Sequence, residues 1–216
     1  LLFTIVLHTA TALSTIFFFR TDLLGLLKGL FIKKYNKSHK FSISIIISMI
    51  PAVLVGLFFE RTINSLFDGN LILVGSMLYV TALLLFLSDF LKMKKNKIGF
   101  KNSFIIGLAQ SIAILPGISR SGATIASAVI MGIDREKAAR FSFLMVIPLI
   151  LGSMGKSILD NELSFENLDV ISLSLGFISA FITGLLACKW MILLVKKSKL
   201  YYFSIYCCIV GSIIIY

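Results

Sequence analysis

Residues 103–131 read SFIIGLAQSIAILPGISRSGATIASAVIM, and this stretch decides how the chain is arranged. It is strongly apolar on both sides of its middle, where Pro116-Gly117 interrupts it and Arg120 adds a charge. Proline removes a backbone hydrogen bond and glycine permits a tight turn, so we expect two half-helices instead of one long helix. Non-helical backbone of this kind is tolerated at membrane depth only where it is buried in protein or lines a wet cavity.

The whole chain is unusually apolar. Of its 216 residues, 58% are hydrophobic and 14% are charged, whereas soluble domains carry about 25% charged residues. The composition, with a mean hydropathy of +0.99, excludes a water-soluble fold and predicts a single transmembrane domain over residues 1–216. The net charge of +11 would favour a nucleic-acid partner in a soluble protein. Here the basic residues lie in short loops, which indicates orientation in a bilayer and no nucleic acid.

Six other apolar stretches are long enough to cross a bilayer, which takes about 20 residues each. They are the ranges 1–19, 41–59, 71–91, 141–158, 169–188 and 200–216. The predicted fold class is therefore all-α: a polytopic membrane protein with about six spanning helices and one helical hairpin at 103–131.

Charge divides the loops into two groups. The segments 20–40, 91–101 and 189–199 are rich in lysine and are predicted to be cytoplasmic, whereas 60–70 and 159–169 are acidic or mixed and are predicted to lie outside. Because the span at 141–158 must run outward, the basic segment before it is cytoplasmic too. The stretch 103–131 therefore begins and ends on one side of the membrane, which predicts a re-entrant hairpin.

Arg120 is the only Arg or Lys placed well inside an apolar stretch, and an intramembrane charge is a functional hypothesis by default. Ser119 is placed to cap the second half-helix, whose N–H groups and positive dipole end attract anions. The planar guanidinium of Arg120 fits phosphate oxygens bidentately. The other candidate residues supply hydroxyls, an amide and glycines that permit close approach: Ser121, Thr124, Gln110, Gly117 and Gly122. Together they favour a phosphate site.

A purely structural interpretation competes with this one. Gly122 and Ala126 have the small-xxx-small spacing of helix packing, and Pro-Gly can simply kink a helix. That interpretation leaves Arg120 without an anionic partner, because the sequence has no acidic residue between Asp89 and Asp134. Gln110 could line the hairpin cavity or hydrogen-bond to a neighbouring helix, and both alternatives stay open.

Three further ionisable residues receive structural predictions. His8 is expected to be a satisfied interior residue of the first span. Asp89 and Glu60 lie near the ends of predicted helices, where we expect them to be solvated.

Residues 116–124 (PGISRSGAT) resemble the signature of the undecaprenyl pyrophosphate phosphatase family, the bacitracin-resistance proteins of bacterial membranes. Gln110 is similar to the Glu/Gln position of that family's second motif, and residues 141–144 (FSFL) and 50–57 (IPAVLVGL) also resemble the family pattern. The resemblance implies hydrolysis of undecaprenyl diphosphate to undecaprenyl phosphate and phosphate in the bacterial inner membrane, which recycles the lipid carrier of cell-wall synthesis. Arg120, Ser119 and Ser121 would then be catalytic, and the other candidates would bind the substrate.

The resemblance also implies an inverted-repeat fold with two hairpins, a divalent cation such as Mg²⁺ or Ca²⁺, and leaves a homodimer open. The family's first motif, with paired glutamates and a Ser-Ser…Gly-His stretch, has no counterpart in this sequence, so no metal ligand is predicted here. The chain begins at Leu1 inside an apolar run. We therefore expect a piece of a longer protein that is inactive alone. The alternative function is a polyprenyl-phosphate transporter or flippase on the same scaffold.

Overall fold

The computed structural model describes residues 2–32, 34–66, 69–90, 96–159, 170–197 and 200–216. Ten helices follow one another in these residues: α1 (Leu2–Phe18), α2 (Arg20–Leu30), α3 (Lys37–Phe58), α4 (Glu60–Leu66), α5 (Leu71–Phe90), α6 (Phe100–Ile112), α7 (Arg120–Ile130), α8 (Arg135–Leu159), α9 (Val170–Lys196) and α10 (Leu200–Ile215). The described residues form no β-strand. A single isolated bridge joins Asn96 to Ile133.

All six predicted spans are helical, as α1, α3, α5, α8, α9 and α10. Within the described residues, α3, α5 and α9 are long and apolar enough to cross a membrane, and α1 with α2 would make a fourth such element if the bent pair is one span. The prediction of an all-α, polytopic membrane protein is confirmed.

The helical hairpin lies where the sequence predicts it. α6 and α7 are separated by a turn over residues 113–119, in which Gly117 adopts a φ of 93°. The two open ends of the hairpin meet, because the main-chain amide of Asn96 donates to Gly132 O at 2.9 Å and its side-chain amide donates to Met131 O at 2.8 Å. This is the same-side geometry of a re-entrant hairpin, and its depth in a bilayer stays a prediction.

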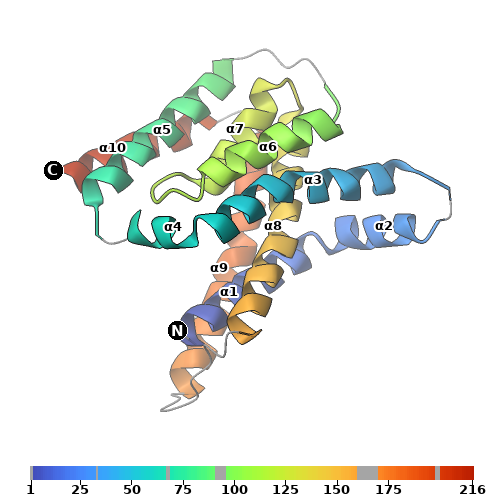
Figure 1. Ribbon diagram of the computed structural model, residues 1–216, viewed down its shortest axis with the longest axis horizontal. Coiled ribbons are helices and arrows are strands. Elements are labelled where there is room, and N and C mark those ends of the chain that lie inside the picture. Colours follow the sequence, from blue (N-terminus) through green and yellow to red (C-terminus); the bar gives the residue numbers. More distant parts are fainter. Residues whose placement is uncertain (1, 33, 67–68, 91–95, 160–169, 198–199) are drawn as a thin grey trace.

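The second arm of the hairpin lies at the centre of the molecule. α7 packs against α5, α6 and α8 (Figure 1). Seven of its eleven residues are buried, and most of them are small, which lets three helices approach closely. Ile125 and Val129 of α7 share a hydrophobic cluster with Phe141 and Met145 of α8. The turn before α7 is therefore supported by a rigid arrangement.

The interpretation of residues 20–40 as a loop is wrong. They contain α2 and the first residues of α3, with α2 bent by 73° from α1. Leucines at positions 23, 26, 27 and 30 have helical spacing. Leu23 and Leu26 pack in a cluster around Phe19. The lysines of the segment lie among and after these leucines and mask the periodicity in the sequence.

The segments predicted to be cytoplasmic meet at one end of the structure. Arg140 of α8 forms an ion pair with Asp22 of α2 at 2.7 Å, and Lys196 of α9 lies 3.4 Å from Glu136 of α8. Residues that the charge pattern assigns to one side of the membrane are thus in contact. Of the segments assigned to the outer side, residues 160–169 lie outside the described residues.

Candidate active site

The start of α7 is a capped helix end with free donors. Ser119 takes the N-cap position, with φ −69° and ψ 112°, and its Oγ accepts a hydrogen bond of 3.2 Å from the Gly122 amide. The Ala123 amide donates to Ser119 O at 2.8 Å. The hydrogen bonds within the described residues leave the amides of Arg120 and Ser121 without an acceptor. An anion at this helix end would find both of them pointing outward.

Arg120 carries a guanidinium that forms no ion pair with the described residues. Its Nη1 atom is buried and has no hydrogen-bond partner among the described residues. The two flanking aspartates are engaged elsewhere: Asp89 pairs with Arg135 at 2.8 Å, and Asp134 Oδ1 accepts from the Lys137 amide at 3.2 Å. A partly buried cation with no partner is costly unless an anion joins it. The isolation expected from the sequence is therefore present within the described structure.

Gln110 lies near the end of α6, on the other arm of the hairpin. Its side chain is 1% exposed, and neither its amide oxygen nor its amide nitrogen has a hydrogen-bond partner in the described residues. Buried amides are rarely left unpaired. The described residues thus show no hydrogen-bond partner of the kind that a packing role would supply. A cavity-lining role for Gln110 stays a prediction.

The two glycines of the predicted site face α5 and the cap. A Cβ at Gly117 would overlap the carbonyl oxygen of Val74, and a Cβ at Gly122 would lie 3.1 Å from the Ser119 Oγ and 3.2 Å from the Thr81 Cγ2. Glycine at 117 is therefore required by the turn and by the main chain of α5. A contact of either glycine with substrate stays a prediction.

The predicted hydroxyls divide into two groups. Ser119 and Ser121 lie together at the helix end, with their Oγ atoms 3.5 Å apart and both side chains partly buried. Thr124 lies one turn further along, fully buried, where its Oγ1 donates to Arg120 O at 2.8 Å and contacts the Ser142 Oγ of α8 at 2.7 Å. The structure thus brings Ser119, Arg120 and Ser121 together and turns Thr124 toward α8.

The resemblance carried by residues 116–124 extends over nearly the whole chain, because the family described as "Bacitracin resistance protein BacA" matches residues 1–213. The chain belongs to the BacA family. The chain is 56% identical to an undecaprenyl-diphosphatase of Christiangramia forsetii, over 98% of this chain and 80% of that relative. Its identity to an undecaprenyl-diphosphatase of Bacteroides fragilis is 47%, over 100% of this chain and 82% of the relative. A Methanobrevibacter smithii protein of the same name is 35% identical over 99% of this chain and 83% of its own length.

Two residues that support the turn and the start of α7 were not predicted from the sequence. Thr81 of α5 is fully buried, and its Oγ1 accepts from the Ser119 amide at 3.1 Å and lies 3.5 Å from Gly117 O. Ser142 of α8 is buried and contacts Thr124. The signal in the sequence was weak, since each is a single hydroxyl residue within a predicted span. Neither contact could be derived without knowing which helices pack against α7.

The predictions for the other ionisable residues have mixed outcomes. Asp89 is not solvated: its side chain is 9% exposed and forms the ion pair with Arg135, because α8 begins beside the end of α5. His8 is not an interior residue in the described structure, although its Nδ1 lies 2.8 Å from Thr4 O. The side chain of Glu60 lies outside the described residues.

A divalent cation finds no ready set of ligands in the described part of this BacA chain. No group of three or more His, Cys, Asp or Glu residues there could hold a metal ion. Asp22, Asp89 and Glu136 are each paired with an arginine. The described residues on their own therefore do not fit a cation.

Proposed function

We propose that this protein hydrolyses undecaprenyl diphosphate to undecaprenyl phosphate and inorganic phosphate, and so recycles the lipid carrier of cell-wall synthesis. Family membership and the names of its relatives support this activity. The structural observation that carries it is Arg120, a cation with no counter-ion in the described structure, at the N-terminus of a half-helix inside an apolar chain. In the reaction, water adds its oxygen to the terminal phosphorus, the P–O–P bond breaks, and the lipid monophosphate leaves with the bridging oxygen.

The groups at the start of α7 suit the binding of a diphosphate. Arg120 would hold two terminal oxygens with its planar fork, while its amide and that of Ser121 donate to the same phosphoryl group. The hydroxyls of Ser119 and Ser121, 3.5 Å apart, supply further donors. Catalysis of phosphoryl transfer rests mainly on positioning and on stabilising the charge of the transferring group. Donors fixed on a capped helix end meet that requirement without reorganisation.

A divalent cation, Mg²⁺ or Ca²⁺, stays a prediction from the family resemblance. When bound beside a diphosphate, such an ion neutralises phosphate charge. Because the described residues do not fit it by themselves, none of the steps above passes through the ion.

The alternative of a polyprenyl-phosphate transporter or flippase is not favoured, because the relatives are named diphosphatases. We place the protein in the inner membrane, since the carrier lipid is the substrate that we propose. A homodimer remains a proposal, and the mass of the purified protein in detergent would test it.

The experiment for the proposed function compares phosphate release from undecaprenyl diphosphate by the purified full-length protein and by Arg120→Lys and Arg120→Ala variants. Both substitutions should lower turnover about 100-fold or more, the usual cost of removing a donor to a developing anion. Arg61→Lys on α4, at an exposed position, is the matched control and should leave turnover unchanged. Near-native turnover in Arg120→Lys, or lipid flux without phosphate release by the native protein, would contradict the proposal.

A further inference from the structure

A second basic site lies apart from the signature. A cavity of about 710 Å³ opens between α2, α3, α8 and the residues just before α6. No residue of the turn 113–119 or of α7 lines it. Arg120 opens α7, whose eleven residues extend about 16 Å, and the cavity lies near the far end of that helix, beside the first turn of α8. The cavity is thus distinct from the site at Ser119, Arg120 and Ser121.

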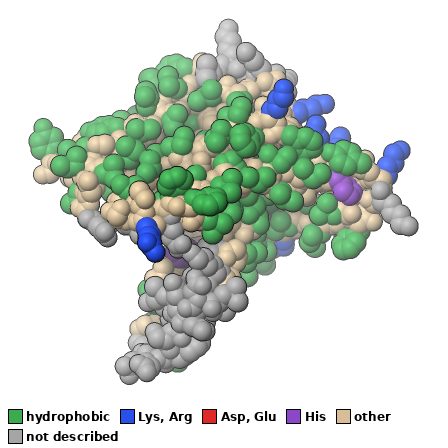
Figure 2. Space-filling model, in the orientation of Figure 1, with side chains coloured by type: hydrophobic (Ala, Val, Ile, Leu, Met, Phe, Trp, Pro, Cys, Tyr) green, Lys and Arg blue, Asp and Glu red, His purple; other side chains and the backbone are tan. Residues whose placement is uncertain are grey.

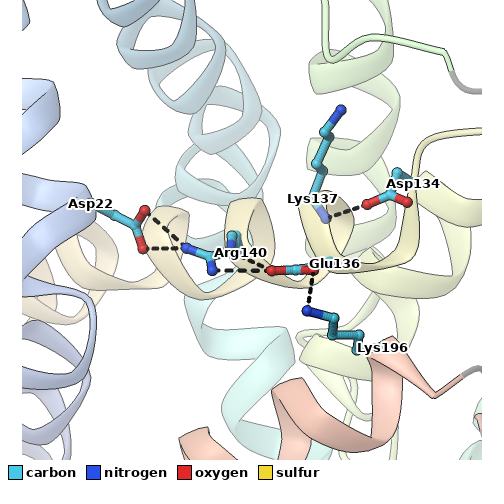
Figure 3. Close-up of polar contacts among 6 residues, drawn as sticks. All are labelled: Asp22, Asp134, Glu136, Lys137, Arg140 and Lys196. Carbon is cyan, nitrogen blue, oxygen red and sulfur yellow. Dashed lines mark hydrogen bonds and ion pairs between the residues drawn. The ribbon is translucent and has the colours of Figure 1, made fainter.

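Part of the charge at the cavity is neutralised internally. Figure 3 shows Arg140 between Asp22 and Glu136, with its Nη1 atom donating to both Asp22 oxygens at 2.9 and 2.7 Å and its Nη2 donating to Glu136 at 3.1 Å. Lys196 completes the row on the far side of Glu136. The hydrogen bond from Arg140 holds the pKa of Glu136 below its usual value, so this carboxylate stays ionised. The two negative charges of the acids and the two positive charges of Arg140 and Lys196 therefore cancel.

Four lysines that line the cavity take no part in this ion-pair network: Lys37, Lys40, Lys97 and Lys137. None of them forms an ion pair within the described residues. Figure 3 shows the side chain of Lys137 extending away from the network, with only its main-chain amide joined to Asp134. Lys37 and Lys40 lie in the first turn of α3, which has no acidic residue, although cations there oppose the helix dipole. These lysines therefore do not serve to stabilise their own helix.

The cavity combines this charge with an apolar wall. Leu26, Phe41 and Leu144 line it together with the lysines. On the outside, α2 exposes Leu24, Leu27 and Leu30 at 54%, 52% and 40%. Figure 2 shows Lys and Arg side chains gathered toward the end of the molecule where α2 and α3 meet, bordered by hydrophobic side chains. With eleven residues, α2 is too short to span a bilayer, which takes about 20 residues, and its bend from α1 suits a position along the interface.

We propose that this cavity binds the phosphate headgroup of an anionic phospholipid of the cytoplasmic leaflet, with the acyl chains lying against α2. The charge pattern of the loops assigns this end of the protein to the cytoplasm, where anionic headgroups occupy basic pockets between helices. Solvated orientation charge would be scattered over the surface, whereas these four lysines come from three separate segments and converge on one cavity with an apolar wall. The proposal does not depend on the phosphatase activity.

Native mass spectrometry of the purified full-length protein in detergent tests the proposal, with added phosphatidylglycerol or phosphatidylcholine. Phosphatidylglycerol should be retained and phosphatidylcholine should not. Lys40→Gln/Lys137→Gln should weaken retention about 25-fold, since each lysine near an anionic headgroup contributes roughly five-fold. Lys40→Arg/Lys137→Arg should keep retention, which separates charge from misfolding. Lys189→Gln/Lys197→Gln is the matched control: it removes the same charge from exposed positions outside the cavity and should bind like the native protein.

Three results would overturn the proposal. Equal loss in the two glutamine variants would assign the effect to diffuse surface charge. Displacement of phosphatidylglycerol by an equal concentration of inorganic phosphate would assign the cavity to the free anion. Loss of retention in Arg120→Ala would place the lipid at the signature instead, and that result would leave the proposed function intact.

Discussion

The main-chain amide of Ser119 donates a hydrogen bond of 3.1 Å to the Thr81 Oγ1. Through it, the cap of α7 is anchored to the middle of α5, a helix that the sequence places almost forty residues earlier. The same hydroxyl contacts Gly117 O at 3.5 Å and donates to Met77 O at 3.2 Å. One buried hydroxyl thus contacts two residues, Gly117 and Ser119, at the end of the turn that leads into Arg120.

Thr81→Val should lower turnover about tenfold while leaving the chain folded. Valine keeps the shape of threonine but leaves the Ser119 amide unpaired, at a cost of about 1–3 kcal/mol. Thr81→Ser should restore most of the activity, because it keeps the acceptor. The measurement is kcat for phosphate release together with the melting temperature in detergent. Thr183→Val on α9, an exposed threonine bonded only within its own helix, is the control, and an equal effect there would remove the positioning role of Thr81.

Thr81 also marks the limit of what the sequence could predict. The break at Pro116-Gly117 and the cap at Ser119 are local features, and both were predicted because their chemistry lies in adjacent residues. The contact with Thr81 depends on which helix packs against the turn, and uniformly apolar spans carry no signal for that choice. The burial of Asp89 was missed for the same reason, since its partner Arg135 lies in a different helix. In residues 20–30 the charge pattern predicts a loop whereas the leucine spacing predicts a helix, and the packing of Leu23 and Leu26 around Phe19 decides for the helix.

Gly117→Ala should abolish most of the activity and destabilise the protein. Gly117 has a φ of 93°, which residues with a side chain rarely adopt. A Cβ added at this position would collide with the main chain of Val74. The strain alone costs about 1–3 kcal/mol. Thermal unfolding in detergent and phosphate release measure the two effects. Gly56→Ala in α3 is the control, because a Cβ there meets no atom within 4 Å and should raise stability by up to about 1 kcal/mol. Equal melting temperatures for the two variants would contradict this account of the turn.

The ion pair between Asp89 and Arg135 should be essential to the fold near the hairpin ends. Asp89 also accepts the Tyr201 amide at 2.9 Å, and Arg135 donates to Asp89 O at 3.1 Å, so the pair joins α5, α8 and α10. Arg135→Met should lower the free energy of unfolding by about 3–5 kcal/mol, because it leaves a buried carboxylate unpaired.

The double variant Asp89→Leu/Arg135→Met tests whether the unpaired charge causes the loss of stability in Arg135→Met. It removes both charges and should recover much of the lost stability. The melting temperature in detergent ranks the native protein and the two variants. A double variant less stable than Arg135→Met would mean that the lost hydrogen bonds, rather than the unpaired charge, dominate the cost.

If the hairpin of α6 and α7 is re-entrant, as the charge pattern predicts, both of its ends face the cytoplasm, and engineered cysteines test this. Cysteines at Asn96 and Lys137, in a background without Cys188, Cys207 and Cys208, should be labelled from the cytoplasmic face by a reagent that does not cross membranes. A cysteine at Ser65, an exposed position of α4, should be labelled only from the opposite face. Labelling of positions 96 and 137 from opposite faces would rule out a hairpin that enters and leaves on one side.

Alanine substitutions at the three serines of α7 and its cap should affect turnover and stability differently. Ser121→Ala should raise the activation free energy by about 1–3 kcal/mol, the cost of losing one hydrogen bond to a charged group. Turnover should fall accordingly, while stability should not change. Ser119→Ala should lower both turnover and stability, because Ser119 Oγ also caps α7 through the Gly122 amide, and a lost cap costs about 1 kcal/mol. Ser127→Ala should change neither, since Ser127 lies two turns along the helix and bonds only to Thr124 O. Melting temperature and kcat for each variant separate the two contributions. Equal losses at all three positions would show that these residues act through helix packing, and the assignment of a phosphate site to the start of α7 would then fail.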